Sequence, residues 1–178
     1  MTDEIKRRIH AFRNALVLAA DTRSHECFHM PRWNTELNNF PGGCCDLASN
    51  FLAHYLRDSD PALQPVIIHM LATQSYREAK KSTVYSHVIV KLGEWHIDLT
   101  LNQFHEYGRR VIIEHKRGTL HTLLHEIEQY EGTVTHRGIS IDSANEEGGE
   151  LYCWLRHTAD RLLTRSSPPV ASSDNNAE

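Results

Sequence analysis

The sequence lacks the patterns that mark disulfide-rich, zinc-binding and membrane-spanning proteins. Its four cysteines include no C-x-x-C pair, and the two adjacent ones are poorly placed to form a disulfide with each other. We therefore expect neither a zinc knuckle nor a disulfide scaffold. No apolar run reaches the roughly 18 residues that a membrane span needs, and the first ten residues hold no charged segment followed by an apolar one. These features favour a cytoplasmic protein.

An excess of positive charge is also missing. The net charge is −4, whereas nucleic acids and anionic membranes require a concentrated basic surface. We therefore expect neither of them as a partner. The 178 residues suit one domain with its own core. We assign this domain to residues 1–163 and expect the Ser-, Pro- and Asn-rich tail at 164–178 to be disordered.

The sequence does contain a glycine-rich turn that delivers two cysteines to the start of a helix. The turn reads Phe40-Pro-Gly-Gly, and apolar residues at helical spacing follow from Leu47 to Leu56. Cys44 and Cys45 therefore stand at the helix N-terminus, where free N–H groups and the helix dipole favour a thiolate. A thiolate is a nucleophile, although the commoner fate of a free cysteine is to be a small buried apolar residue.

The remaining periodicity predicts an α+β fold. In this fold an antiparallel sheet packs against the helix that carries the nucleophilic cysteine at its N-terminus. Helical spacing is present at 3–20, 119–130 and 150–163, strand patterns at 65–72, 84–92, 95–101 and 109–115, and loop composition at 22–43 and 75–82. Gly93 and Glu94 separate two alternating runs, which indicates a hairpin.

A two-residue turn at this point fixes which side chains share a face of the hairpin. Leu92 then pairs with Trp95, and His87 and Asp98 become diagonal neighbours with Cα atoms roughly 7–8 Å apart. We expect the opposite face, which includes Val84 and Leu101 and is nearly all apolar, to be core. A carboxylate beside an imidazole fixes its tautomer and raises its basicity, as in a Cys-His-Asp triad. The alternative is a surface ion pair of little energetic weight.

These segments resemble the core of papain-like and transglutaminase-like cysteine enzymes. The resemblance rests on Gly43–Ser49, Ser86–Val90, Gly93-Glu94-Trp95 and Asp98-Leu99-Thr100, and it covers about residues 38–104. It implies a nucleophilic Cys on a helix, a His base and an Asp that orients it. The stretches from Phe40 to Cys45 and from Asp98 to Phe104, with the His87 strand between them, are also similar to a group of bacterial proteins of uncharacterised activity. No substrate follows from either resemblance.

The resemblance suggests a role for individual residues. Cys45 has Ser49 four residues on, as in the papain pattern Cys-x-x-x-Ser, whereas Cys44 fits the Cys-x-Asp-x-Ala pattern of transglutaminase-like sequences. We favour Cys45 as the nucleophile and keep Cys44 as the alternative. Asn39 stands six residues before Cys45, where papain-like enzymes carry a Gln that stabilises the oxyanion. Gln103 is a second candidate for this role.

A Cys-His-Asp site attacks acyl carbons through a thioester intermediate. We expect hydrolysis of a peptide, isopeptide or glutamine side-chain amide in a protein or peptide substrate, without a cofactor. Transglutaminase-type transfer to an amine and a non-catalytic protein-binding module are the alternatives. A metal site is a further rival because there are thirteen histidines, and His121 and His125 have i, i+4 spacing. Their segment lacks the glutamate of a metalloprotease helix, so we expect no metal ligands.

Overall fold

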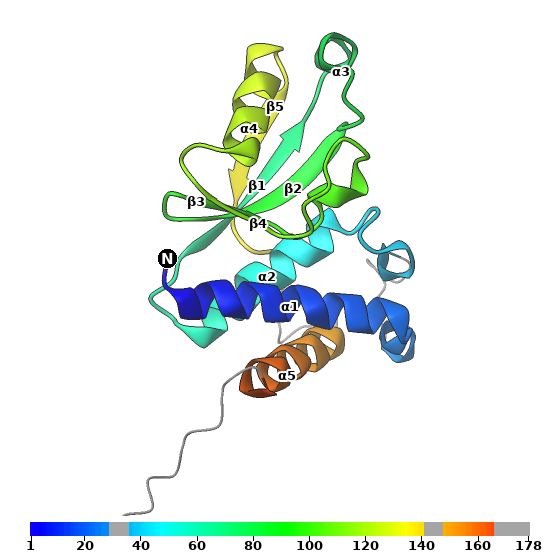
Figure 1. The fold of residues 1–178 in the computed structure, drawn as a ribbon, viewed down its shortest axis with the longest axis vertical. Helices are drawn as coiled ribbons and strands as arrows, with labels where there is room; N and C mark the ends of the chain where they lie inside the picture. Colours follow the sequence, from blue (N-terminus) through cyan, green and yellow to red (C-terminus); the bar gives the residue numbers. More distant parts are fainter. Residues whose placement is uncertain (29–35, 141–147, 166–178) are drawn as a thin grey trace, which may run out of the picture.

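The computed structural model describes residues 1–28, 36–140 and 148–165, which form an α+β fold with a five-stranded antiparallel sheet (Figure 1). The helices are α1 (Asp3–Asp21), α2 (Cys45–Ser59), α3 (Gln74–Lys80), α4 (Thr119–Gln129) and α5 (Gly149–Arg165); the strands are β1 (Pro65–Leu71), β2 (Ser86–Leu92), β3 (Trp95–Asp98), β4 (Ile112–His115) and β5 (Thr133–Arg137); short 3-10 helices are η1 (Ser24–Cys27), η2 (Glu36–Asn39) and η3 (Leu101–Gln103). The strand order is β4-β3-β2-β1-β5.

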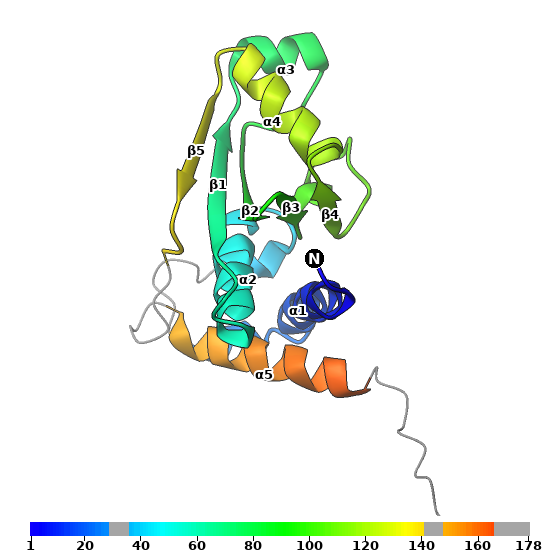
Figure 2. The ribbon, with the colours of Figure 1, turned by 90° about the vertical axis from the view of Figure 1, so that its left-hand side faces the viewer.

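The sheet is covered on both faces. One apolar cluster joins α1, α2 and α5 to the sheet through residues such as Ile67, Val88 and Val90. A second cluster joins α3 and α4 to the alternate positions, among them Ile68 and Ile89. Figure 2 shows α4 at one end of the molecule and α1 with α5 at the other. In the described part of the chain, no helix combines the length and the hydropathy needed to cross a bilayer.

The hairpin of β2 and β3 has the expected register. Leu92 pairs with Trp95 and Val90 with Ile97, so the two-residue turn at Gly93 and Glu94 is confirmed. Two positions differ from the expected apolar face. Val84 and Leu101 lie outside the strands and pack in the cluster that includes α4, because Val84 precedes the start of β2 and Leu101 follows the end of β3. Strand alternation no longer decides the direction of a side chain beyond the strand end.

Two elements were missed by the sequence pattern. The expected loop at 75–82 is largely the helix α3, which begins where the Thr73 side chain accepts a hydrogen bond from Tyr76 N at 3.2 Å and ends at Lys81 with a φ of 52°. Tyr76 is its only buried residue, so no apolar period exists to detect. The fifth strand, β5, lies at the sheet edge with a mostly polar sequence.

The first and last helices were predicted with different accuracy. Helix α1 begins as predicted, with the Thr2 hydroxyl accepting from Ile5 N at 3.3 Å. Helix α5 continues to Arg165, two residues beyond the expected boundary of the domain. The rest of the expected tail, residues 166–178, lies outside the described residues, as do residues 29–35 of the expected loop.

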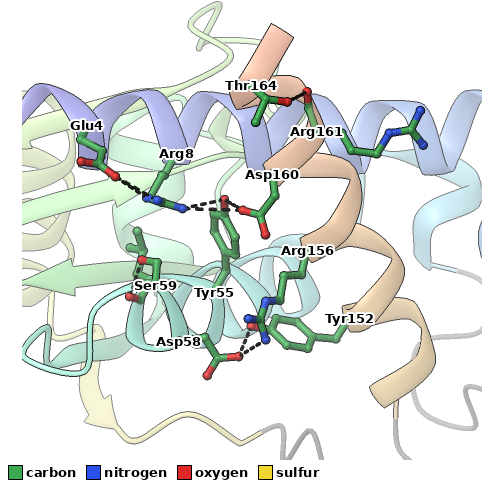
Figure 3. A network of polar contacts seen from close by, with 11 residues as sticks. Glu4, Arg8, Tyr55, Asp58, Ser59, Tyr152, Arg156, Asp160, Arg161 and Thr164 are labelled. Atoms are coloured by element: carbon green, nitrogen blue, oxygen red, sulfur yellow. Dashed lines mark hydrogen bonds and ion pairs between the residues drawn. The ribbon is translucent and has the colours of Figure 1, made fainter. Parts of the chain in front are cut away.

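Two tyrosines connect α5 to α2 by hydrogen bonds (Figure 3). The Tyr55 hydroxyl donates to Asp160 Oδ1 at 2.7 Å, and the Tyr152 hydroxyl donates to Asp58 Oδ2 at the same distance. The Tyr55 ring also stacks on Phe12 of α1, with ring centroids 5.0 Å apart. The three helices are therefore held together by buried rings whose polar ends are satisfied.

We expect Tyr55→Phe to lower the free energy of unfolding by about 1–2 kcal/mol, because the ring stays in place while the hydrogen bond to Asp160 and the weaker one from Arg8 are lost. Urea denaturation followed by far-UV circular dichroism measures the change. Tyr85→Phe is the matched control. Tyr85 is 60 % exposed, so this substitution removes a hydroxyl from the surface. An equal cost for the two substitutions would contradict the assigned role of the Tyr55 hydroxyl.

Candidate active site

The glycine-rich turn sets the start of α2. Gly42 N donates to Asn39 O at 2.7 Å, and Cys44 N donates to Pro41 O at 3.2 Å. A Cβ on Gly42 would lie 3.1 Å from Asn39 O, so this turn favours a residue without a side chain. Gly43 has a φ of 73°, in the left-handed region that favours glycine. The turn ends at Cys44, and the helix begins at the next residue.

The two adjacent cysteines have different environments. Cys44 is fully buried in the cluster around α2, and its Sγ lies 3.5 Å from Gly42 O. Cys45 is half-buried and lies close enough to the His87 side chain to raise the pKa of His87. The fold therefore brings Cys45 to the histidine that the hairpin pattern indicated, whereas Cys44 is buried in the core. One step along a helix rotates a side chain by about 100°, so adjacent residues face different surroundings.

His87 and Asp98 form a buried pair. His87 Nε2 lies 2.5 Å from Asp98 Oδ2, and both side chains are 0 % exposed. The second oxygen, Asp98 Oδ1, accepts from Thr100 N at 2.7 Å, from Leu101 N at 3.0 Å and from Thr100 Oγ1 at 3.3 Å. The surface ion pair considered from the sequence is therefore wrong. The carboxylate is fixed at both oxygens, and it holds the imidazole in one orientation.

The charges at this pair determine the protonation of the histidine. Burial opposes a charge on His87, but the Asp98 carboxylate and the hydrogen bond with Cys45 outweigh burial and raise the pKa of His87 to about 10. His87 is then an imidazolium at neutral pH. A cationic imidazole beside a thiol favours the thiolate, which is the nucleophilic form. The contacts therefore place a cationic imidazole beside the Cys45 thiol.

Gln103 lies between the glycine-rich turn and the His87 ring. Its Oε1 accepts from Gly43 N at 3.0 Å, and its Nε2 lies 3.3 Å from His87 Nδ1. Since Asp98 occupies Nε2 of His87, Nδ1 is the nitrogen left to face Gln103 and Cys45. Asn39, the other oxyanion candidate, is exposed, and the contact it makes with the turn uses its backbone oxygen. The oxyanion role of either amide stays a prediction.

Further contacts at the site were not assigned from the sequence. Ser49 Oγ donates to Val88 O at 2.9 Å and so connects α2 to the strand that carries His87. The Phe104 ring meets the His87 ring edge-on, with centroids 5.3 Å apart. The Cys-x-x-x-Ser spacing signalled Ser49 only as a likeness to other enzymes. The ring contact has no local signal, because η3 separates Phe104 from the strand pattern.

The rival metal site gains no support from the structure. His121 and His125 lie on α4, and His125 Nε2 is 3.0 Å from Gln129 Nε2. Among residues 1–28, 36–140 and 148–165, no group of three or more His, Cys, Asp or Glu side chains is arranged to hold a metal ion. The i, i+4 pair therefore lacks a third ligand within that part of the chain.

We expect Asp98→Asn to cost about 3 kcal/mol of stability at pH 6, as is usual when one partner of a buried ion pair is removed. The pKa of His87 is raised from 6.5 to about 10 in the folded state, so the stabilisation is full below pH 6.5 and is lost as pH rises through 10. The cost measured by urea denaturation should therefore shrink between pH 6 and pH 10.

Asp60→Asn is the matched control. Asp60 is exposed and accepts from Ala62 N at 2.9 Å, a bond that an Asn side chain can also accept. Its cost should be small and independent of pH over the same range. A cost of Asp98→Asn that is constant or grows with pH would contradict the charged state of His87.

Comparisons with known proteins add two relatives. The chain is 34 % identical over 107 residues to the uncharacterized protein YuaU of Escherichia coli, both in strain K12 and in strain UTI89 / UPEC. The match covers 60 % of this chain and 45 % of each relative, so the chain spans less than half the length of the proteins it matches. No family model matches the chain. No solved structure matches it either.

Proposed function

We propose that this protein is a thiol-dependent acyl-transfer enzyme that hydrolyses an amide bond on a papain-like or transglutaminase-like core. The observation that carries the proposal is the buried hydrogen bond between His87 and Asp98, with the Cys45 side chain close enough to His87 to raise its pKa. The three side chains contain a nucleophile, a base and a group that orients the base. The burial of His87 and Asp98 supports it further, since a surface pair would leave the imidazole free to rotate.

The reaction has two halves. The Cys45 thiolate attacks the amide carbon, and the carbonyl electron pair moves to oxygen to give a tetrahedral oxyanion. The oxyanion collapses, the C–N bond breaks, and His87 gives its proton to the leaving amine. Water then attacks the resulting thioester while neutral His87 accepts a proton from it. Release of the acid restores the thiolate and the imidazolium.

The surroundings of the triad serve these steps. Asp98 keeps Nδ1 of His87 directed at the thiol, because its own carboxylate is held by Thr100 N and Leu101 N. The first N–H groups of a helix have no partner within it, so the Cys45 N–H is a donor for the oxyanion. Gln103 or Asn39 would supply the second donor. To stabilise the oxyanion, the side-chain amide must direct an N–H group toward the space next to the Cys45 thiol.

We assign this chemistry to the cytoplasm. None of the four cysteines forms a disulfide, although Cys44 and Cys45 are adjacent and Cys27 and Cys153 are exposed. Reducing compartments keep thiols in this state, and a thiol nucleophile requires it. We propose a protein or peptide as the substrate, because peptide bonds, isopeptide bonds and glutamine side-chain amides occur in proteins and peptides.

The first test is the rate of labelling by iodoacetamide at pH 7. Exposure alone would label Cys27 and Cys153 first, since both are exposed and Cys45 is half-buried. We expect Cys45 to react at least about tenfold faster than either, because the neighbouring imidazolium favours its thiolate. Peptide mapping by mass spectrometry at several times gives the four rates.

His87→Gln and Asp98→Asn should each slow the labelling of Cys45 toward the rate of an ordinary thiol. His105→Gln is the matched control, because His105 is a 75 % exposed imidazole. Thermal unfolding of each variant establishes that it is folded. Labelling of Cys44 instead would move the nucleophile by one residue, and a Cys45 rate no higher than that of Cys27 would contradict the proposal.

The second test identifies the reaction. Peptides from a cell lysate are incubated with the wild type and with Cys45→Ala and compared by mass spectrometry. A new chain terminus indicates peptide hydrolysis, a gain of about 1 Da at Gln indicates deamidation, and an amine adduct indicates transglutaminase-type transfer, each following from how the thioester is resolved. Hydrolysis products that depend on Cys45 are the expected outcome. Products that are identical for both proteins would favour a non-catalytic binding module.

A further inference from the structure

An open pocket of about 490 Å³ lies between α4 and the sheet, on the face opposite α2. This volume is within the range of roughly 300–1,000 Å³ that is typical of small-molecule sites. The lining residues come from β1, β2, the turn after β2, β3, β5, the chain before α4, and α4 itself, and the polar ones that matter here are Lys91, Glu94, His96, Lys116, Arg117 and Glu128. None of these residues belongs to the Cys45 site.

The charged side chains around the pocket are mostly cationic. Lys91, Lys116 and Arg117 face two carboxylates, those of Glu94 and Glu128. Lys116 Nζ lies 3.1 Å from Glu94 Oε2, so one cation and one carboxylate neutralise each other. Within the described part of the chain, Lys91 and Arg117 have no ion pair. Two unpaired cations therefore border one pocket in a chain whose net charge is −4.

His96 contributes a buried polar ring to the same wall. The residue is 9 % exposed, and its Nδ1 is buried without a hydrogen-bond partner among the described residues. Its neighbours across the sheet are Lys91 on β2 and Glu114 on β4, and the His121 ring lies with its centroid 6.4 Å away on α4. A buried nitrogen without a partner is costly, and no described residue fixes which nitrogen of this ring carries the proton.

The electrostatic surroundings of His96 agree with an excess of positive charge. Burial lowers the pKa of His96, and Lys91 and His121 lower it further, while Glu114 and Glu94 oppose them. The net direction is down. A ring in this state is neutral and has one N–H, and an anion bound in the pocket within reach of that N–H would accept from it and fix the tautomer.

We propose that this pocket binds a small phosphate-bearing ligand, held by Lys91, Arg117 and the ring of His96. A phosphate monoester carries a charge of about −1.5 to −2 at pH 7 and has three strong acceptor oxygens, which match two unpaired cations and one ring N–H. The guanidinium of Arg117 suits paired phosphate oxygens. The site is independent of the Cys45 chemistry, so either proposal can fail without the other.

The test uses the full chain and two probes, inorganic phosphate and adenosine monophosphate, at constant ionic strength. Isothermal titration calorimetry gives the dissociation constants, and ¹⁵N–¹H spectra of the histidine rings report on His96. We expect saturable binding of at least one probe with a shift of the His96 ring signals. Tighter binding of adenosine monophosphate identifies an ester as the ligand, and equal or tighter binding of inorganic phosphate identifies the free anion.

Lys91→Gln and Arg117→Gln should each weaken binding by about tenfold, the usual effect of one charge-assisted hydrogen bond. Neither side chain is buried, so both variants should fold, which thermal unfolding establishes. Arg7→Gln is the control for loss of a distant exposed cation, and Cys45→Ala should bind like the wild type. Binding that does not saturate, that leaves the His96 signals unchanged, or that Arg7→Gln weakens equally would overturn the proposal.

Discussion

The hydrogen bond between His87 and Asp98 is the interaction on which the arrangement of the site depends. Two ionisable groups with 0 % exposed side chains are tolerable in a protein interior only when each satisfies the other and the remaining polar atoms find partners. Asp98 meets this condition through the backbone N–H groups of Thr100 and Leu101. These same bonds turn the chain out of β3 and into η3. The hydrogen bonds to Asp98 therefore both end β3 and orient His87.

The turn into η3 also determines what surrounds the imidazole. It carries Gln103 and Phe104 back over His87, one on its Nδ1 and the other against its ring. Gln103 in turn accepts from Gly43 N, in the turn that precedes α2. Two segments far apart in sequence, the glycine-rich turn and η3, are thereby joined at the thiol. Ser49 adds a second connection from α2 to the His87 strand.

The two faces of the sheet have different neighbours. Helix α2 packs on β1 and β2 with α1 and α5 behind it, and the tyrosines of this layer fix α5 by hydrogen bonds to carboxylates. Helix α4 covers the other face less completely, which leaves the pocket lined by His96 and Lys91. One apolar core thus holds helix α2, which carries Cys45, in place, while the opposite face keeps polar groups within reach of solvent. A sheet covered on both faces allows this division.

The sequence by itself determined the α+β class, the main helices, the hairpin register and the pairing of His87 with Asp98. These features follow from local rules: apolar periodicity, capping, and the parity that a two-residue turn imposes on cross-strand neighbours. Local rules fail where few residues carry the signal, and so α3 with one buried side chain and the polar edge strand β5 were missed. Only the tertiary structure decided that the pair is buried, that Cys45 meets His87 while Cys44 is buried in the core, and that Gln103 contacts the imidazole. Each of these depends on the distance between segments remote in sequence, and that distance is set by packing rather than by any pattern within one segment.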